Sequence, residues 1–128
     1  MELIENLSIG DGEAVLIGSP SRPFEDKIKE EYLRIAMKSR YVIEAHLPQC
    51  FVVNVMKKPN QVFVVVIKNE EFNQRALSEL TATIKKSQVL QDAIIWGVNL
   101  KSKFLLDIRA SKCQIYTTPS SRWKFWNK

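Results

Sequence analysis

The segment Asp92-Ala-Ile-Ile-Trp-Gly-Val-Asn-Leu100, followed by Phe104-Leu-Leu-Asp-Ile-Arg109, decides the fold of this chain more than any other. Each stretch is a short apolar run and a polar segment separates them, which is typical of two adjacent strands joined by a turn. We therefore predict strands over residues 93–98 and 104–110, and we expect them to form the central or closing pair of a sheet.

Single residues of this strand pair carry further expectations. Trp96 and Phe104 should lie in or near the core. Asp107 falls inside the second strand, which indicates an exposed or edge position opposite a cation on a neighbouring strand. Residues 114–116 could continue that strand beyond an irregularity.

Three apolar runs further upstream also indicate strands. The run 14–18 ends in a cluster of turn residues and predicts a buried strand. The runs 51–56 and 62–67 are separated by Lys57-Lys-Pro-Asn-Gln61, which favours a hairpin with a five-residue loop. Because the run 62–67 is apolar at every position, we expect its strand to be covered on both faces.

Two segments have helical spacing. From Pro23 onward apolar residues recur every three to four positions, and acidic residues precede basic ones, as the helix dipole favours. The segment 41–45 that follows is compatible with either a helix or a strand. Asn69 resembles an N-cap, and after it comes one stripe of apolar residues spaced by four: Phe72, Ala76, Leu80 and Ile84.

The predicted order β-α-β-β-α-β-β indicates an α+β fold, with a single mixed sheet of about five strands and two main helices packed on it. A chain of 128 residues that is 45% apolar can close one core, so we expect a single domain over 1–116 and a tail over 117–128. No run approaches the roughly 18 to 20 apolar residues of a spanning helix, and no basic segment precedes an apolar one near Met1. We expect a cytoplasmic protein.

Charge is distributed unevenly along the chain. Residues 1–80 hold ten Lys/Arg and twelve Asp/Glu, a net of −2, whereas residues 81–128 hold nine Lys/Arg and two Asp/Glu, a net of +7. Such asymmetry is typical of a protein with an anionic partner, although it also serves solubility alone. The candidate anion-binding residues ahead of the tail are Lys85, Lys86, Lys101, Lys103, Arg109 and Lys112.

The tail alternates cations with aromatic residues. Its candidate partner-binding residues are Arg122, Trp123, Lys124, Phe125 and Trp126. Such aromatic side chains can stack on bases, lie at a lipid headgroup interface or anchor in a pocket of a partner protein. Alternatively, both Trp residues fold back onto the domain.

No catalytic signature occurs in the sequence. The motifs GxxxxGK[ST], GxGxxG, HExxH and GxSxG are absent, so we predict no catalytic, cofactor-binding or metal-binding residues, and an enzyme is disfavoured. His46 is the only histidine, and a capping or surface position is expected for it. Cys50 and Cys113 have no CxxC spacing, which favours a buried, reduced pair.

Several segments, in order along the chain, carry a family resemblance. Residues 92–100 followed by 106–109 are similar to a strand "ANIIWG" that leads into a strand "IRVTVIATG", residues 12–18 resemble "GxAMMG", and residues 51–55 are similar to "GVLVNIT". These are strands of the C-terminal domain of FtsZ, the bacterial tubulin homologue. The run 62–67 departs from that pattern as an added strand.

This resemblance implies a function through protein contact. The glycine-rich nucleotide loop of the family belongs to a domain without a counterpart here, so GTP binding is not expected. A domain of this kind would act as an adaptor, a cap on a filament-forming GTPase or an assembly module. Its loop at Gly10, Asp11 and Gly12 would face the partner, and its tail would dock a second protein or a membrane.

An alternative function follows from the charge. The cationic C-terminal third would hold the phosphates of a nucleic acid while Trp123 and Trp126 stack on its bases. A third possibility is a chain that assembles with copies of itself, for which the sequence leaves the oligomeric state open.

Overall fold

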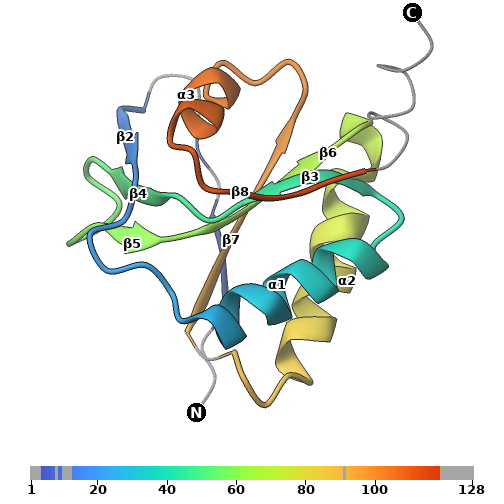
Figure 1. The fold of residues 1–128 in the computed structure, drawn as a ribbon. Helices are drawn as coiled ribbons and strands as arrows, with labels where there is room; N and C mark the ends of the chain where they lie inside the picture. Colours follow the sequence, from blue (N-terminus) through green and yellow to red (C-terminus); the bar gives the residue numbers. More distant parts are fainter. Residues whose placement is uncertain (1–3, 8, 10–12, 91, 119–128) are drawn as a thin grey trace, which may run out of the picture.

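The computed structural model describes residues 4–7, 9, 13–90 and 92–118, and it has the predicted α+β architecture. A mixed five-stranded sheet carries α1 and α2 on one face, and a second, three-stranded sheet with α3 on the other (Figure 1). The elements are β1 (Ile4–Leu7), β2 (Val15–Gly18), α1 (Asp26–Lys38), β3 (Val42–His46), β4 (Gln49–Val52), β5 (Asn60–Gln61), β6 (Phe63–Ile67), the 3₁₀ turn η1 (Glu70–Phe72), α2 (Asn73–Lys85), β7 (Ala93–Asn99), α3 (Leu105–Ala110) and β8 (Gln114–Thr117).

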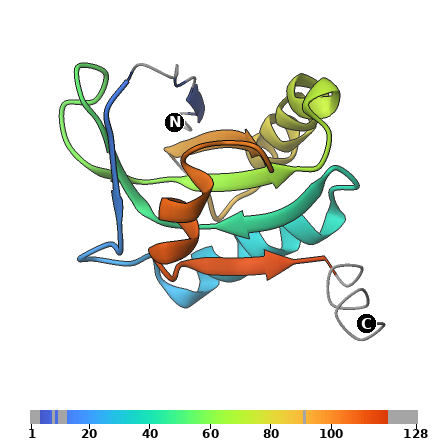
Figure 2. The same cartoon turned by 90° about the horizontal axis from the view of Figure 1, so that it is seen from above.

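The five-stranded sheet has the order β1-β7-β6-β3-β8, and Figure 2 shows the last four of these strands side by side. β7 is parallel to both β1 and β6, whereas β3 is antiparallel to β6 and β8. The helix α2 connects β6 to the parallel β7, so the carboxyl ends of these two strands lie at the same edge of the sheet.

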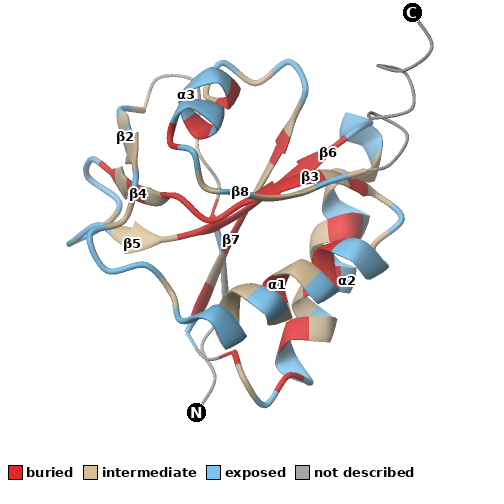
Figure 3. Cartoon of the chain, in the orientation of Figure 1, coloured by how far each residue is buried: buried red, intermediate tan, exposed pale blue. Residues whose placement is uncertain are grey.

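β6 lies in the middle of the sheet and is buried on both faces, as its uniformly apolar sequence predicts. Each of its five residues is at most 1% exposed, and Figure 3 shows a continuous buried band along it. Its side chains alternate: Phe63, Val65 and Ile67 enter the core beneath the two helices, and Val64 and Val66 enter the core beneath the small sheet. One strand therefore contributes to both cores.

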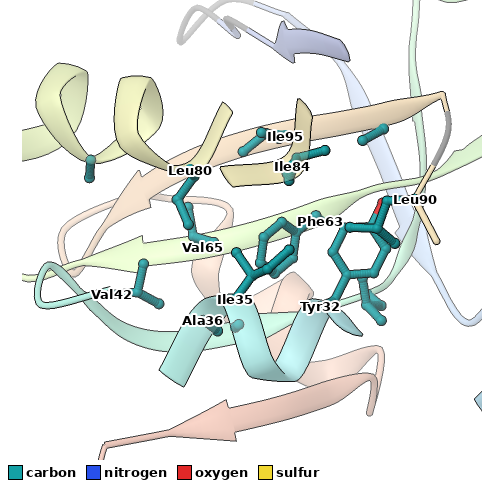
Figure 4. Packing of buried hydrophobic residues seen from close by; sticks show 14 of the residues in the cluster. Tyr32, Ile35, Ala36, Val42, Phe63, Val65, Leu80, Ile84, Leu90 and Ile95 are labelled. Atoms are coloured by element: carbon teal, nitrogen blue, oxygen red, sulfur yellow. The ribbon is translucent and has the colours of Figure 1, made fainter. Parts of the chain in front are cut away.

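The two predicted helices are confirmed, and their apolar stripes form the larger core. α1 buries Tyr32, Ile35 and Ala36, and α2 buries the predicted stripe from Ala76 to Ile84, while Phe72 is partly buried in η1. Figure 4 shows Tyr32 and Ile35 gathered around Phe63 of β6. Burying each such large side chain contributes roughly 1.5–3 kcal/mol, so this layer fixes both helices on the sheet.

The segment with ambiguous helical or extended character is strand β3. A register shift between Val42 and Glu44 marks a bulge in its pairing with β6. After the bulge, Glu44 pairs with Val66 and His46 with Val64. Because directly paired residues share a face, Glu44 and His46 both point toward the α3 layer.

The predicted strand over residues 104–110 is wrong, because this segment is helix α3. Leu105 and Ile108, three positions apart, are buried, whereas Leu106 between them is 78% exposed. That pattern fits a helical face and not the alternation of a strand. The helix ends at Ala110, and Lys112, just after the C-cap Ser111, has a φ of 59°, in the left-handed region common just after helices. Asp107 therefore lies on an exposed helix surface and not on a strand.

The predicted hairpin is also corrected. The first run forms strand β4 only to Val52, and a turn with Asn54 at φ 70° follows it. β4 pairs with the two-residue β5 and not with β6, which joins the larger sheet. The run 14–18 does form the strand β2, but the strand is half-buried to exposed instead of buried.

The remaining elements agree with the sequence in outline. Trp96 is buried and Phe104 partly buried, and their rings meet edge to face at 5.4 Å. Residues 114–117 form a strand, the edge strand β8, but it pairs with β3 and does not continue a strand over residues 104–110 as predicted. Thr118 N–H donates to the Ile43 carbonyl. Among the described residues, no helix is long and apolar enough to cross a membrane.

Candidate functional site

The outer face of the small sheet presents apolar side chains to solvent. β2 and β4 are antiparallel, and the register places Leu16 opposite Phe51. Their neighbours Ile17 and Cys50 form the next pair and point to the inner side, where Cys50 is fully buried. Strand alternation therefore directs Leu16 outward, where it is 65% exposed.

A hollow of about 470 Å³ lies over this face. Its lining is formed by Leu16, Ile17, Gly18, Ser19, Gln49, Cys50, Phe51, Lys57 and Pro59. Lys57 is the one charged residue among the described residues that line it. In the turn after β4, Val53 and Val55 add two more exposed apolar side chains. The small sheet thus offers an apolar surface with a cationic border.

The edge strand of this sheet adds backbone groups to the same surface. Within the described part of the chain, β2 pairs with β4 alone, and β4 continues the sheet to β5. An edge strand presents a row of N–H and C=O groups that can pair with an extended peptide. β2 is four residues long, so a peptide paired with it would be held by a few backbone hydrogen bonds together with side-chain contacts.

A charged cluster joins β3 to α3, with Glu44 and His46 buried and Arg109 reaching them from the exposed side of α3. Arg109 donates from Nε to Oε2 and from Nη2 to Oε1 of Glu44, both at 2.9 Å. His46 Nε2 lies 2.6 Å from Glu44 Oε2 and must carry the donated proton, because an ionised carboxylate only accepts. His46 Nδ1 has no hydrogen-bond partner among the described residues.

Burial and hydrogen bonding act on this carboxylate in opposite directions. Desolvation raises the pKa of Glu44, but the hydrogen bonds and charges of His46 and Arg109 outweigh it and lower the pKa to about 2. Glu44 is therefore ionised at neutral pH and ties α3 to the sheet. The expected surface or capping role of His46 is wrong, because its side chain is fully buried within this cluster.

The two cysteines give no sign of a reactive site. Cys50 is buried, and desolvation, with a smaller contribution from Cys113, raises the pKa of its thiol to about 12. Cys113 is half-buried, and both thiols are free. In the described ranges, no group of three or more His, Cys, Asp and Glu side chains could hold a metal ion.

The candidate anion-binding residues fall into separate places. Lys101 and Lys103 line one cleft at the carboxyl end of β7. Lys85 and Lys86 lie at the far end of α2, about 20 Å from the start of that helix, given its 13 residues. The other two are elsewhere: Lys112 lines a different hollow, and Arg109 is paired with Glu44.

Several predicted partner-binding residues lie outside the described residues. These are Gly10, Asp11 and Gly12 in the N-terminal loop, and Arg122, Trp123, Lys124, Phe125 and Trp126 in the tail. Their roles stay predictions. The nucleic-acid alternative depends on that tail for its stacking aromatic residues, while the six candidate cations ahead of the tail lie in the separate places given above.

Two features of these sites were missed by sequence reasoning. The apolar run 14–18 predicts a buried strand, although a strand of four residues flanked by turns is also typical of a sheet edge. Glu44 and His46 lie two positions apart, so a strand places them on one face. A carboxylate and an imidazole sharing the face of an otherwise apolar strand could have indicated a buried polar cluster.

Comparisons with protein-family models, with curated proteins and with solved structures gave no match for this chain.

Proposed function

We propose that the protein is a non-catalytic interaction module that binds an extended segment of another protein along the β2–β4 face. The observation that carries this proposal is the exposed Leu16, paired with Phe51 over a 470 Å³ hollow. A partner that covers this side chain, which is 65% exposed, removes apolar surface from water. That burial stabilises the complex.

The chemistry of the surface indicates the chemistry of the partner. The hollow accepts apolar side chains, and Lys57 at its border, followed by the exposed Lys58, favours carboxylates nearby. An extended segment places every second side chain on one face, so two apolar residues at positions i and i+2 would enter the hollow. The preferred segment therefore has alternating apolar residues flanked by Asp or Glu.

A peptide-display selection on the folded protein tests this proposal. We expect enrichment of segments with alternating apolar residues and acidic flanks. The same selection on a Leu16→Glu variant should lose them, because the new carboxylate fills the apolar surface and repels the acidic flanks. Leu16 is exposed, so the substitution leaves the core intact.

Leu106→Glu serves as the matched control. Leu106 is 78% exposed but lies on α3, outside the lining of the hollow, so this variant should retain the selected peptides. Peptides that bind the parent protein and the Leu16→Glu variant equally, or a selection that enriches no motif, would contradict the proposal.

The FtsZ resemblance suggests a filament-forming GTPase as one partner class to include. A pelleting assay measures polymer mass and GTP turnover with and without the protein. A cap on filament ends would lower both, whereas unchanged values would remove this partner class and leave the peptide-binding proposal to the selection above.

A further inference from the structure

A second cleft lies at the carboxyl ends of the parallel strands β6 and β7. The pairing of β1 with β7 stops at Leu7 and Trp96, and β7 continues for three more residues, Gly97–Asn99. Beyond that point a cleft of about 660 Å³ opens between β7, the start of α2 and the loop that leads to α3. It is separate from the hollow on the small sheet, and the two share no lining residue.

The loop after β7 uses its own side-chain acceptors. Lys101 N–H donates to Asn99 Oδ1 at 2.8 Å, and Phe104 N–H donates to Ser102 Oγ at 3.2 Å. The groups that remain for a ligand are therefore mainly hydrogen-bond donors: the side-chain N–H groups of Asn99 and the hydroxyl of Ser102.

The opposite wall adds another amide. Asn73 at the start of α2 lines the cleft, and its side chain makes no hydrogen bond with the described residues. It lies close to β7 because residue 97 is glycine: a Cβ on Gly97 would come within 2.8 Å of Asn73 Oδ1. The strand thus leaves room for this amide beside the cleft.

The charges of the lining are mixed and unequal. Lys101 and Lys103 contribute two cations, and Glu70 is the one acidic residue among the described residues that line the cleft. Lysine and amide donors suit the oxygens of a phosphate group, whereas a carboxylate suits the hydroxyl hydrogens of a sugar. Phe104, with Lys103 Nζ 5.2 Å from its ring centroid, forms an apolar part of the wall.

We propose that this cleft binds a phosphorylated sugar, either free or as part of a nucleotide. Lys101 holds the phosphate together with the donors of Asn99 and Ser102, and Lys103 adds positive charge to the same wall. Glu70 accepts hydrogen bonds from the sugar hydroxyls, and Asn73 binds the ring side of the ligand. The position agrees with the tendency of ligands to bind beyond the carboxyl ends of parallel strands.

Amide chemical shifts of the full chain, titrated with four compounds, test this proposal. Ribose 5-phosphate and AMP should give saturable shifts at residues 97–104 and Asn73, and a comparison of the two distinguishes a free sugar phosphate from a nucleotide. Ribose and inorganic phosphate should each bind about 10-fold more weakly than ribose 5-phosphate, because ribose lacks the hydrogen bonds of the phosphate and inorganic phosphate lacks those of the sugar. Inorganic phosphate that binds as tightly as ribose 5-phosphate would overturn the assignment of a sugar.

Paired variants complete the test. Lys101→Ala/Lys103→Ala should weaken ribose 5-phosphate about 10-fold or more, whereas Lys85→Ala/Lys86→Ala, which removes the same charge at the far end of α2, should not. Unchanged amide shifts outside the cleft show that each variant is folded. The absence of saturable shifts up to about 10 mM ligand, or equal weakening by both variants, would refute the site.

Discussion

At the residue scale, the least expected feature is the ionised Glu44 in the interior. Only 8% of this residue is exposed, yet it accepts three hydrogen bonds from His46 and Arg109. The sequence places His46 on the same strand face as Glu44, but it does not indicate Arg109, which is 65 positions away in a segment whose pattern predicts a strand. A buried charge is stable only when its partners are placed by tertiary structure, which local patterns do not contain.

This cluster predicts acid sensitivity of the fold. The pKa of Glu44 falls from an ordinary 4.5 to about 2 in the folded state, so the unfolded chain binds this proton more readily. The stabilisation is complete above pH 4.5 and is lost as the pH falls from 4.5 toward 2. The shift corresponds to roughly 3 kcal/mol, which urea unfolding followed between pH 7 and pH 2.5 can measure.

Glu44→Gln is the variant that isolates this contribution. We expect it to lower the free energy of unfolding at pH 7 by about 2–3 kcal/mol, because Arg109 and His46 lose their carboxylate. Its stability should also depend less on pH between 4.5 and 2. Glu31, whose pKa is lowered by hydrogen bonds from Arg34 and Ser87, keeps some acid dependence in the variant. An unchanged pH slope would show that Glu44 does not carry the effect.

The crowding around Gly97 predicts that adding a side chain at this position destabilises the fold. An added Cβ would lie 2.8 Å from Asn73 Oδ1 and 3.2 Å from Leu77 Cδ2, so both side chains would have to move. We expect Gly97→Ala to cost about 1 kcal/mol in urea unfolding, a moderate value because the atoms that are crowded belong to side-chain ends. Adding Asn73→Ala should recover part of this loss.

Gly18→Ala is the matched control for that substitution. Gly18 also lies in a strand, but no atom comes within 4 Å of the position of its added Cβ. Its substitution should be neutral or stabilise the fold slightly through the unfolded state. Equal destabilisation by the two substitutions would indicate a general cost of alanine in these strands and not crowding at Gly97.

At the scale of elements, long periodic segments were predictable and short ones were not. The stripe from Ala76 to Ile84 repeats every four residues over about two helical turns, which predicts a helix. The run 62–67 is apolar at every position, which predicts a strand buried on both faces. In contrast, the six residues of α3 contain Leu105, Leu106 and Ile108, which fit one helical turn as well as a short strand. Tertiary packing decides between them.

Two alanine substitutions distinguish a helix from a strand in this segment. In α3, Ile108 is fully buried and Leu106 is exposed, whereas a strand would place both on one face. We expect Ile108→Ala to lower the free energy of unfolding by about 2–4 kcal/mol and Leu106→Ala to change it by less than about 0.5 kcal/mol. Similar effects of both substitutions in denaturant unfolding would favour the strand.

At the scale of the whole molecule, the fold class was predictable but the sheet order was not. Strand composition indicated a mixed sheet with two helices, while the pairing of β6 with β3 and β7 joins segments that are about 20 to 30 positions apart. Local turn chemistry favoured the wrong partner, the run immediately before β6. The same distant pairing gives β6 its central place and lets its alternate side chains fill both cores.

Because β6 belongs to both cores, we expect the two layers to unfold together. The chain has three tryptophans, so Trp123→Phe/Trp126→Phe leaves Trp96 as the single reporter of the core beneath the small sheet. Far-UV circular dichroism reports mainly α1 and α2, which cover the other core. The two signals should have the same urea midpoint, as in a two-state transition. A fluorescence change at lower urea would show that the small sheet and α3 detach while the helical layer stays folded, and would refute a single cooperative unit.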